Sequence, residues 1–151
     1  MQKIKPFLWF DDQAEDAMNF YTSVFEDSRV IGVSRYGEAG PGEAGTVMIA
    51  TFEIEGQQFT ALNGGPRFKF NEAISFEIDC ETQEEVDYLW ESLTAGGGEE
   101  SMCGWLKDKY GLSWQVVPRI LGELMTDEDR EKAKRVTEAM LSMRKIEIAE
   151  L

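Results

Sequence analysis

Residues 4–25, IKPFLWFDDQAEDAMNFYTSVF, join a strand pattern to a helix pattern. Residues 4–10 are rich in aromatic and β-branched side chains, which is typical of a strand. Asp12-x-x-Glu15 then has the spacing of a capping box, and apolar residues recur after it at helical spacing. The stretch therefore predicts a strand that leads directly into a helix.

The same pattern returns in residues 74–93, ISFEIDCETQEEVDYLWESL. A constant offset along both strand and helix superposes this copy on the first, with Phe76 on Leu8. A second offset superposes two later strand patterns, with Trp114 on Phe59. Self-similarity of this kind indicates two copies of one structural unit.

The repeat predicts an α+β fold in which two βαβββ modules form curved mixed sheets. We place module 1 at about residues 3–65, module 2 at about 72–118 and a C-terminal helical extension at about 119–151. All of residues 1–151 are predicted to form one domain. Turn chemistry at Glu55-Gly56 predicts a hairpin inside module 1.

The C-terminal extension has no counterpart in the repeat. Thr126 is predicted to N-cap a helix there, with the acidic residues 127–129 in its first turn. Four apolar residues recur along this helix and form a stripe that needs cover. We expect the stripe to pack on its own subunit, with a partner subunit as the alternative; its residues are Ala133, Val136, Met140 and Met143.

Composition excludes several classes of function. The chain of 151 residues has 15 basic and 29 acidic side chains, a formal net charge of −14, and no histidine. Such a surface repels phosphate groups, so we expect neither nucleic acid nor membrane as a partner. Catalytic triads that need an imidazole are excluded. Two cysteines, no signal-peptide pattern and no long apolar run predict a cytoplasmic protein.

Four runs carry a resemblance to a known family over essentially the whole chain, C-terminal helix included. They are PFLWFDDQAEDAMNFYTSVF, YGEAGPGEAG, FTALNGGPRFKFNEAISFEIDCETQEEVDYLWESL and CGWLKDKYGLSWQVVP. These runs resemble the PhnB-like family of the vicinal oxygen chelate superfamily, which includes glyoxalase, bleomycin-resistance and dioxygenase proteins. The family is also labelled 3-demethylubiquinone-9 3-methyltransferase. The resemblance implies a glyoxalase-like fold and a homodimer.

The methyltransferase label does not fit the residues. A methyl donor such as S-adenosylmethionine usually binds at a glycine turn between a strand and the helix that follows it. The cluster Gly96-Gly97-Gly98 instead follows a helix pattern and precedes a strand, which is an ordinary helix end. We therefore expect no cofactor.

The resemblance also implies a divalent metal in the cup of the curved sheets, held by His, Gln or Glu side chains from the first and last strand of each module. Alternation places Phe7 (or Pro6), Thr60, Ser75 and Gln115 at those positions. One amide and two hydroxyls supply neither the carboxylate oxygens that a hard cation needs nor the ligands of zinc. We therefore predict no metal site.

Glu77 is the candidate catalytic residue. Alternation directs its carboxylate into the cup, where desolvation would raise its pKa and suit it to act as a general base. The alternative is an ion pair with Arg67, Lys69 or Lys107.

Eight further residues are predicted to bind a ligand. Aromatic side chains suit a flat molecule, hydroxyl and amide groups orient it, and a thiol is activated where a lysine lies nearby. The alternatives are core aromatics, a turn at Asn63 and a buried, unreactive Cys103. The predicted ligand-binding residues are Phe7, Trp9, Thr60, Asn63, Ser75, Cys103, Trp105 and Gln115, with Phe68 and Phe70 as further aromatic candidates and Cys80 as a structural residue.

Together these patterns predict a metal-independent protein that binds a small, partly aromatic or apolar molecule in the cup. The first alternative is an enzyme of the same fold, a lyase, an isomerase or a dioxygenase-like protein, that uses Glu77 or an unrecognised divalent metal. The second alternative is a protein whose cups are filled by side chains and which acts through its surface.

Overall fold

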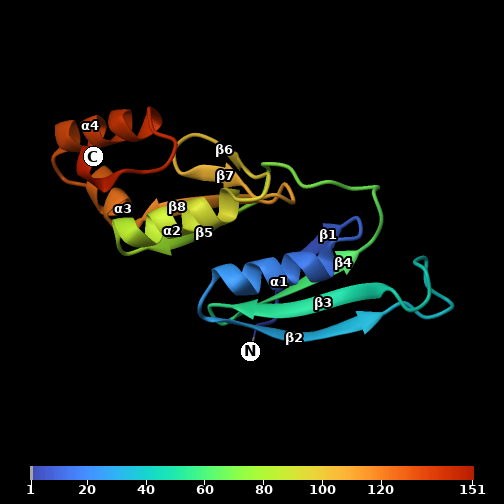
Figure 1. Cartoon of the computed structure of the whole chain (residues 1–151). Coiled ribbons are helices and arrows are strands. Elements are labelled where there is room, and N and C mark those ends of the chain that lie inside the picture. The colour runs from blue at the N-terminus through green and yellow to red at the C-terminus, as the bar shows by residue number, and fades with distance from the viewer. Residues whose placement is uncertain (1) are drawn as a thin grey trace. The chain divides into compact units, whose positions relative to one another are not determined.

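The structure of the chain is a computed structural model that describes residues 2–151 (Figure 1). The chain forms two compact units, one ending at Lys69 and one beginning at Phe70. Each unit contains a four-stranded sheet, with strand order β1-β4-β3-β2 in the first and β5-β8-β7-β6 in the second. The same order occurs twice, which confirms the predicted pair of βαβββ modules. No helix among residues 2–151 has the length and apolar character needed to cross a membrane.

The first unit places one helix against one face of its sheet. Strand β1 runs parallel to β4, and β3 runs antiparallel to both β2 and β4. Helix α1 packs on β3 and β4, where the Phe52 ring stacks between the rings of Tyr21 and Phe59. The elements are β1 (Phe7–Phe10), α1 (Ala14–Val24), β2 (Ser28–Arg35), β3 (Val47–Ile54) and β4 (Gln57–Asn63).

A two-residue hairpin joins β3 to β4, as the sequence predicts. Glu55 and Gly56 have φ angles of 50° and 79°, and Ile54 pairs with Gln57 across the turn. Two consecutive residues with positive φ match the right-handed twist of the flanking strands. This turn holds the register of the β3–β4 pair.

The start of α1 differs from the prediction. No side chain of the Asp12-x-x-Glu15 segment caps the helix; Gln13 is the N-cap residue, without a side-chain hydrogen bond. Instead Asn63, the last residue of β4, accepts a hydrogen bond from the Ala14 backbone N–H at 2.8 Å. The cap comes from a residue distant in sequence, which a local pattern does not reveal.

The second unit repeats the arrangement with shorter strands. Its elements are β5 (Ser75–Cys80), α2 (Gln83–Thr94), β6 (Glu99–Glu100), β7 (Trp105–Lys107) and β8 (Ser113–Pro118). Here Thr82 caps the helix as predicted, since its Oγ1 accepts from the Glu85 N–H, while the Glu85 carboxylate accepts from the N–H of Glu81, the residue before the cap. Strand β5 is parallel to β8, and β7 is antiparallel to β6 and β8.

The C-terminal extension contains two helices, α3 (Arg119–Met125) and α4 (Arg130–Leu141), and a 3-10 turn, η1 (Ile148–Glu150). The prediction that Thr126 begins the helix is wrong, because Thr126 ends α3 and Asp129 caps α4. The Asp129 carboxylate accepts hydrogen bonds from the Glu131 and Lys132 N–H groups.

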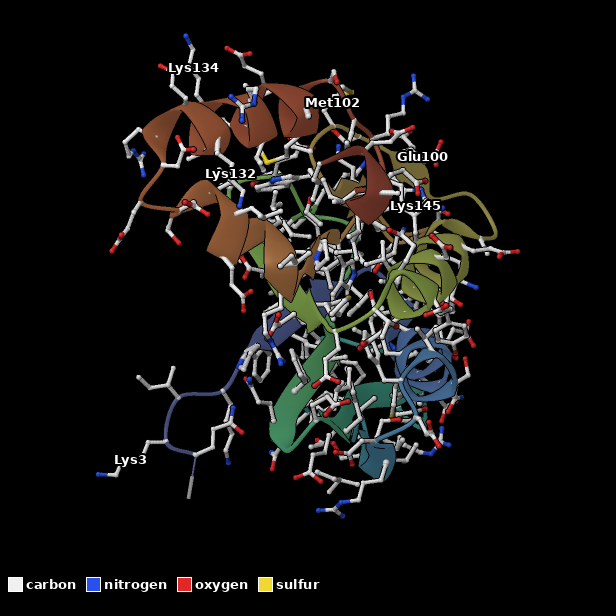
Figure 2. The ribbon with its side chains drawn as sticks, turned by 90° about the vertical axis from the view of Figure 1, so that its left-hand side faces the viewer. Lys3, Glu100, Met102, Lys132, Lys134 and Lys145 are labelled. Carbon is white, nitrogen blue, oxygen red and sulfur yellow. The ribbon has the colours of Figure 1, made fainter. Side chains whose placement is uncertain are left out.

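The apolar stripe of α4 packs within the chain, as expected. Val136 and Met143 belong to a buried cluster with Leu121 and Ile146, while Lys134 points away from this core (Figure 2). Gln83 of α2 forms two hydrogen bonds with the C-terminal segment. Its side-chain amide donates to the Ile146 carbonyl and accepts from the Ile148 N–H. These two hydrogen bonds hold the 3-10 turn η1 against α2.

Candidate functional site

Each sheet has one face covered by its helix and one open face. On the covered faces the side chains are buried, as for Leu8 and Phe10 of β1 and for Trp114 and Val116 of β8. Side chains alternate along a strand, so the intervening residues belong to the open faces. The open faces contain most of the predicted ligand-binding residues.

The open face of the first unit carries aromatic side chains at the β1 side of the sheet. Strand register places Phe7 beside Thr60 and Trp9 beside Leu62. Phe7 is 59% exposed. Trp9 packs edge to face on Phe68, with ring centroids 4.9 Å apart, and its Nε1 donates to a backbone carbonyl, that of Gly65, at 2.9 Å. This face offers aromatic surface and the hydroxyls of Thr60 and of its register partner Thr51.

The open face of the second unit carries two cross-strand rows of mostly polar residues. Register places Ser75, Ser113 and Lys107 in one row and Glu77, Gln115 and Trp105 in the next. We call these six residues the open-face array. Four of them, Ser75, Glu77, Trp105 and Gln115, are predicted site residues, and the fold brings them together from β5, β7 and β8.

The two serine hydroxyls of the open-face array differ in their hydrogen bonding. Gln115 Nε2 donates to Ser75 Oγ at 2.9 Å. Ser113 is only 1% exposed, and its Oγ has no hydrogen-bond partner within the described part of the chain. Buried polar groups are paired in nearly all proteins, so an unpaired Oγ is a notable feature of this face.

A hollow of about 200 Å³ lies beside Ser113, with Trp105, Lys107 and Glu72 also in its lining. Lys107 Nζ forms an ion pair with Glu72, which precedes β5. The hydrogen bond from Lys107 holds the pKa of Glu72 below its ordinary value, and Glu72 in turn raises the pKa of Lys107. Both groups are therefore charged at neutral pH.

Glu77 does not meet the expectation of a desolvated carboxylate, because its side chain is exposed. The proposed ion pair with Lys107 is also not formed, since Lys107 pairs with Glu72. β5 is an edge strand of the second sheet, so its side chains are less covered than those of a central strand. The strand pattern alone does not indicate how much of this face is covered. A catalytic role for Glu77 remains a prediction.

Ser113 and Lys107 are the members of the open-face array that sequence reasoning missed as ligand-binding residues. The repeat equates Thr60 with Gln115, but Thr60 pairs with Phe7 while the counterpart of Phe7, Ser75, pairs with Ser113. The two modules thus differ in register by two residues. A shift of two keeps the same face and moves every partner by one row.

The expected metal positions do not fit a metal. Phe7 has no donor, Thr60 and Ser75 supply hydroxyls, and the Gln115 amide is hydrogen-bonded to Ser75. Among residues 2–151 there is no group of three or more His, Cys, Asp or Glu residues that could hold an ion. Neither a hard cation nor zinc finds its preferred ligands in this donor set.

The two cysteines differ in their surroundings. Cys80 is fully buried at the end of β5, and desolvation, with the charges of Glu85 and Asp79, raises the pKa of its thiol to about 12. This fits a structural residue. Cys103 is half-buried and precedes β7 with a φ of 60°, and its N–H donates to the Met143 carbonyl. Its backbone therefore helps to hold the C-terminal extension.

Asn63 is fully engaged in the structure of the first unit. Its Oδ1 caps α1, its Nδ2 donates to the Val47 carbonyl, and its own carbonyl accepts from Tyr36 Oη. It does not begin a turn but ends β4. It also lines a hollow of about 490 Å³ with several carboxylates, among them Asp12 and Glu15. Its predicted role in ligand binding stays a prediction.

Comparison with known proteins identifies the family. The model of the family described as 3-demethylubiquinone-9 3-methyltransferase matches residues 2–117. The chain belongs to this PhnB-like family. The match ends before α3, so the expectation that the resemblance includes the C-terminal helix is not supported, and α3 and α4 lie outside the family model.

Solved structures agree with the family and the fold. The PhnB protein of Bacillus cereus is 43% identical, with 78% of this chain and 99% of that chain covered and a TM-score of 0.70. A Pseudomonas aeruginosa protein is 19% identical over 78% of this chain and 98% of that one, with a TM-score of 0.64. The fosfomycin resistance protein of Listeria monocytogenes is 19% identical over 81% and 94%, with a TM-score of 0.57. No curated protein matches the sequence.

The methyl donor implied by the family's description does not fit this PhnB-like chain. The connection from β1 to α1 is Asp11-Asp12-Gln13, and the connection from β5 to α2 is Glu81-Thr82, so neither contains glycine. Gly96-Gly97-Gly98 lies between α2 and β6, at a helix end. The glycine turns that would let the backbone approach such a cofactor are therefore absent from the strand-to-helix connections of both modules.

Proposed function

We propose that the protein binds a small, partly aromatic molecule on the open faces of its sheets, without a metal ion. The observation that carries this proposal is the open-face array of the second unit. Its two rows bring a tryptophan, an amide, two hydroxyls and two charged groups onto one face. Ligand sites combine apolar surface with a few placed polar groups in this way.

Two features support binding without a metal. The donor groups at the positions where the superfamily holds its ion are an amide and hydroxyls, which are poor ligands for the divalent cations of this fold. The Gln115–Ser75 hydrogen bond engages the amide nitrogen and leaves the amide oxygen as the acceptor for a ligand. The residues are thus suited to recognition by hydrogen bonds and stacking.

The proposal is tested by titrating the ¹⁵N-labelled protein with indole, a neutral flat probe, and following the amide resonances by NMR. We expect shifts grouped at Ser75, Glu77, Lys107, Ser113 and Gln115. A Trp105→Leu variant removes the half-buried ring of the array and should weaken binding at least severalfold. The matched control is Tyr88→Leu, an exposed aromatic of helix α2, which covers the opposite face of the sheet.

Two results would contradict the proposal. Indole shifts confined to residues outside both open faces would refute the location. Stoichiometric divalent metal in protein purified without chelator, with a lower melting temperature after chelation, would refute binding without a metal. In that second case the enzymatic alternative with an unrecognised metal would replace it.

An enzyme that uses Glu77 is the second candidate. Glu77 lies directly beside Gln115 in the open-face array, where its carboxylate would contact a ligand held by the amide. Its exposure leaves it without the burial that raises a carboxyl pKa toward neutrality. A ligand that excluded water from this face would supply that burial, so a Glu77→Gln variant should then bind ligand and lose turnover.

We also propose the homodimer that the family resemblance implies and a cytoplasmic location. Large aromatic side chains of the first unit, Phe7 and Phe68, are 59% and 54% exposed, which suits a surface that a second copy covers. Both cysteines are free, as in a reducing compartment. Light scattering should give twice the chain mass of 17.1 kDa, and a monomer would contradict the dimer.

A further inference from the structure

The unpaired hydroxyl of Ser113 indicates what the open-face array lacks. Its Oγ is buried and has no partner in the described chain, although it lies on the wall of the 200 Å³ hollow. A buried hydroxyl without a hydrogen bond is unfavourable, and proteins retain one where a ligand or water completes it. A molecule bound in the hollow would be placed to form this missing hydrogen bond with Ser113 Oγ.

Lys107 lies directly beside Ser113 on the neighbouring strand β7. Cross-strand neighbours have Cβ atoms about 5 Å apart, so one small group can contact both side chains. The lysine ammonium and the serine hydroxyl both donate hydrogen bonds. The hydroxyl can also accept but the ammonium cannot, so a group that contacts the ammonium must carry an acceptor, and beside a cation that acceptor is best an anion.

The Lys107 ammonium already binds one carboxylate, that of Glu72. Its carboxylate forms the ion pair with Lys107, but its side chain is 59% exposed, and Ser113 Oγ is left without a bond. Ion pairs in contact with water are weak, because solvent screens them. The Glu72 carboxylate is therefore a displaceable occupant that satisfies only one of the two donors.

The remaining charges limit the ligand to a single negative charge. Glu99 pairs in register with Lys107, and its carboxylate would repel a doubly charged phosphate. Glu100 also lines the hollow and extends from the short strand β6 (Figure 2). Its carboxylate is already engaged, by Trp90 Nε1 and Arg144. Trp105 supplies apolar surface beside these groups.

We propose that this hollow binds the carboxylate of a small aromatic monocarboxylate, which displaces Glu72 from Lys107 and accepts a hydrogen bond from Ser113 Oγ. The ring of the ligand then packs on Trp105. This inference rests on the proposed function and names the chemical class of its ligand. Glu72 is an internal competitor, so it lowers the affinity of the free protein.

The test compares benzoate with benzamide, its neutral analogue, by calorimetry, with NMR to locate the bound probe. Benzoate should shift Trp105, Lys107 and Ser113 resonances and bind at least about tenfold more tightly than benzamide, because a charge-assisted hydrogen bond is lost in the amide. Lys107→Met should abolish the difference. Ser113→Ala should weaken benzoate about tenfold and still fold, since it removes an unpaired group.

The Glu72→Gln variant distinguishes removal of the internal competitor from a simple surface-charge effect. It should tighten benzoate binding severalfold, because the internal competitor is removed. Glu84→Gln is the matched control: it removes the same charge from an exposed position of α2, outside the hollow. Equal gains in the two variants would overturn the proposal, as would equal binding of benzoate and benzamide, or no benzoate binding to Glu72→Gln.

The two proposals fail in different ways. If indole shifts the open-face array while benzoate does not bind Glu72→Gln, the carboxylate inference is wrong and the proposed function stands. If neither probe shifts any residue of the open faces, both are wrong. If benzoate shifts only residues of the first unit, the hollow beside Ser113 is not the carboxylate site.

Discussion

Within the second unit, Asp108 is the side chain whose substitution should most clearly lower the free energy of unfolding. It is 2% exposed in the turn between β7 and β8. Its Oδ1 accepts from the Tyr110 and Leu112 N–H groups at 2.9 and 3.1 Å, and its Oδ2 accepts from Trp114 Nε1 at 2.9 Å. In Asp108→Asn one oxygen becomes an NH₂ group, and a donor then faces a donor.

The magnitude follows from these three bonds. The asparagine oxygen can keep the two backbone donors, which leaves the buried Trp114 N–H opposite the new NH₂ group. Losing a hydrogen bond to a charged group costs about 1.5–3 kcal/mol, and an unpaired buried donor costs about 1–3 kcal/mol. We expect Asp108→Asn to lower the free energy of unfolding by about 3 kcal/mol.

Urea unfolding followed by far-ultraviolet circular dichroism measures this loss. Asp79→Asn is the control, because Asp79 is a half-exposed carboxylate whose ion pair with Arg119 lies in water. A double-mutant cycle with Trp114→Phe isolates the donor–donor contact: Asp108→Asn should cost less when the indole N–H is absent. A loss below about 1 kcal/mol, or an equal loss in both backgrounds, would refute the reasoning.

Three further outcomes are expected. Ile146→Ala should lower the free energy of unfolding by about 3 kcal/mol, because Ile146 is fully buried in the C-terminal cluster, and a change below about 1 kcal/mol by urea unfolding would contradict this. Gly98→Ala should destabilise, since a Cβ there would lie 2.8 Å from the Lys107 carbonyl oxygen and 2.7 Å from the Thr94 Cα. Gly122→Ala, with nothing within 4 Å, should stabilise α3 by about 0.5–1 kcal/mol, and equal melting temperatures of the two variants would refute the contrast. The raised pKa of Cys80 should leave stability unchanged below about pH 9 and reduce it between pH 9 and 12, because the unfolded thiol ionises first. Unfolding measured across this range should show a smaller decrease in Cys80→Ala, and an identical decrease would count against a buried thiol.

Local patterns predicted the elements well where the interactions are local. The Thr82 cap of α2 and the Glu55-Gly56 hairpin each depend on residues next to one another in sequence, and both form. The first helix did not follow its local pattern, because Asn63 of a distant strand supplies the cap. The prediction for Thr126 failed for a different reason: Thr126 ends α3, and the nearby Asp129 caps α4.

The candidate site was predicted in part. Alternation placed Ser75 and Gln115 on one face, and the structure joins them by a hydrogen bond. The register of β5 against β8 differs by two residues from that of β1 against β4, so the offsets between the modules do not identify Ser113. The pairing of Lys107 with Glu72 was also missed, since Glu72 lies in a connecting segment with no pattern to mark it.

The repeat, the α+β class and the absence of imidazole from an acidic chain follow from residue types and their periodicity alone. Which residues of neighbouring strands meet depends on how the chain folds in three dimensions. Pairing register depends on long-range hydrogen bonds, and a shift of two residues keeps every side chain on its face and so leaves no trace in the hydrophobic pattern. That shift places Ser113 beside Ser75, and the pairing of β7 with β8 places it beside Lys107, so the hollow lined by Ser113 and Lys107 becomes part of the candidate site.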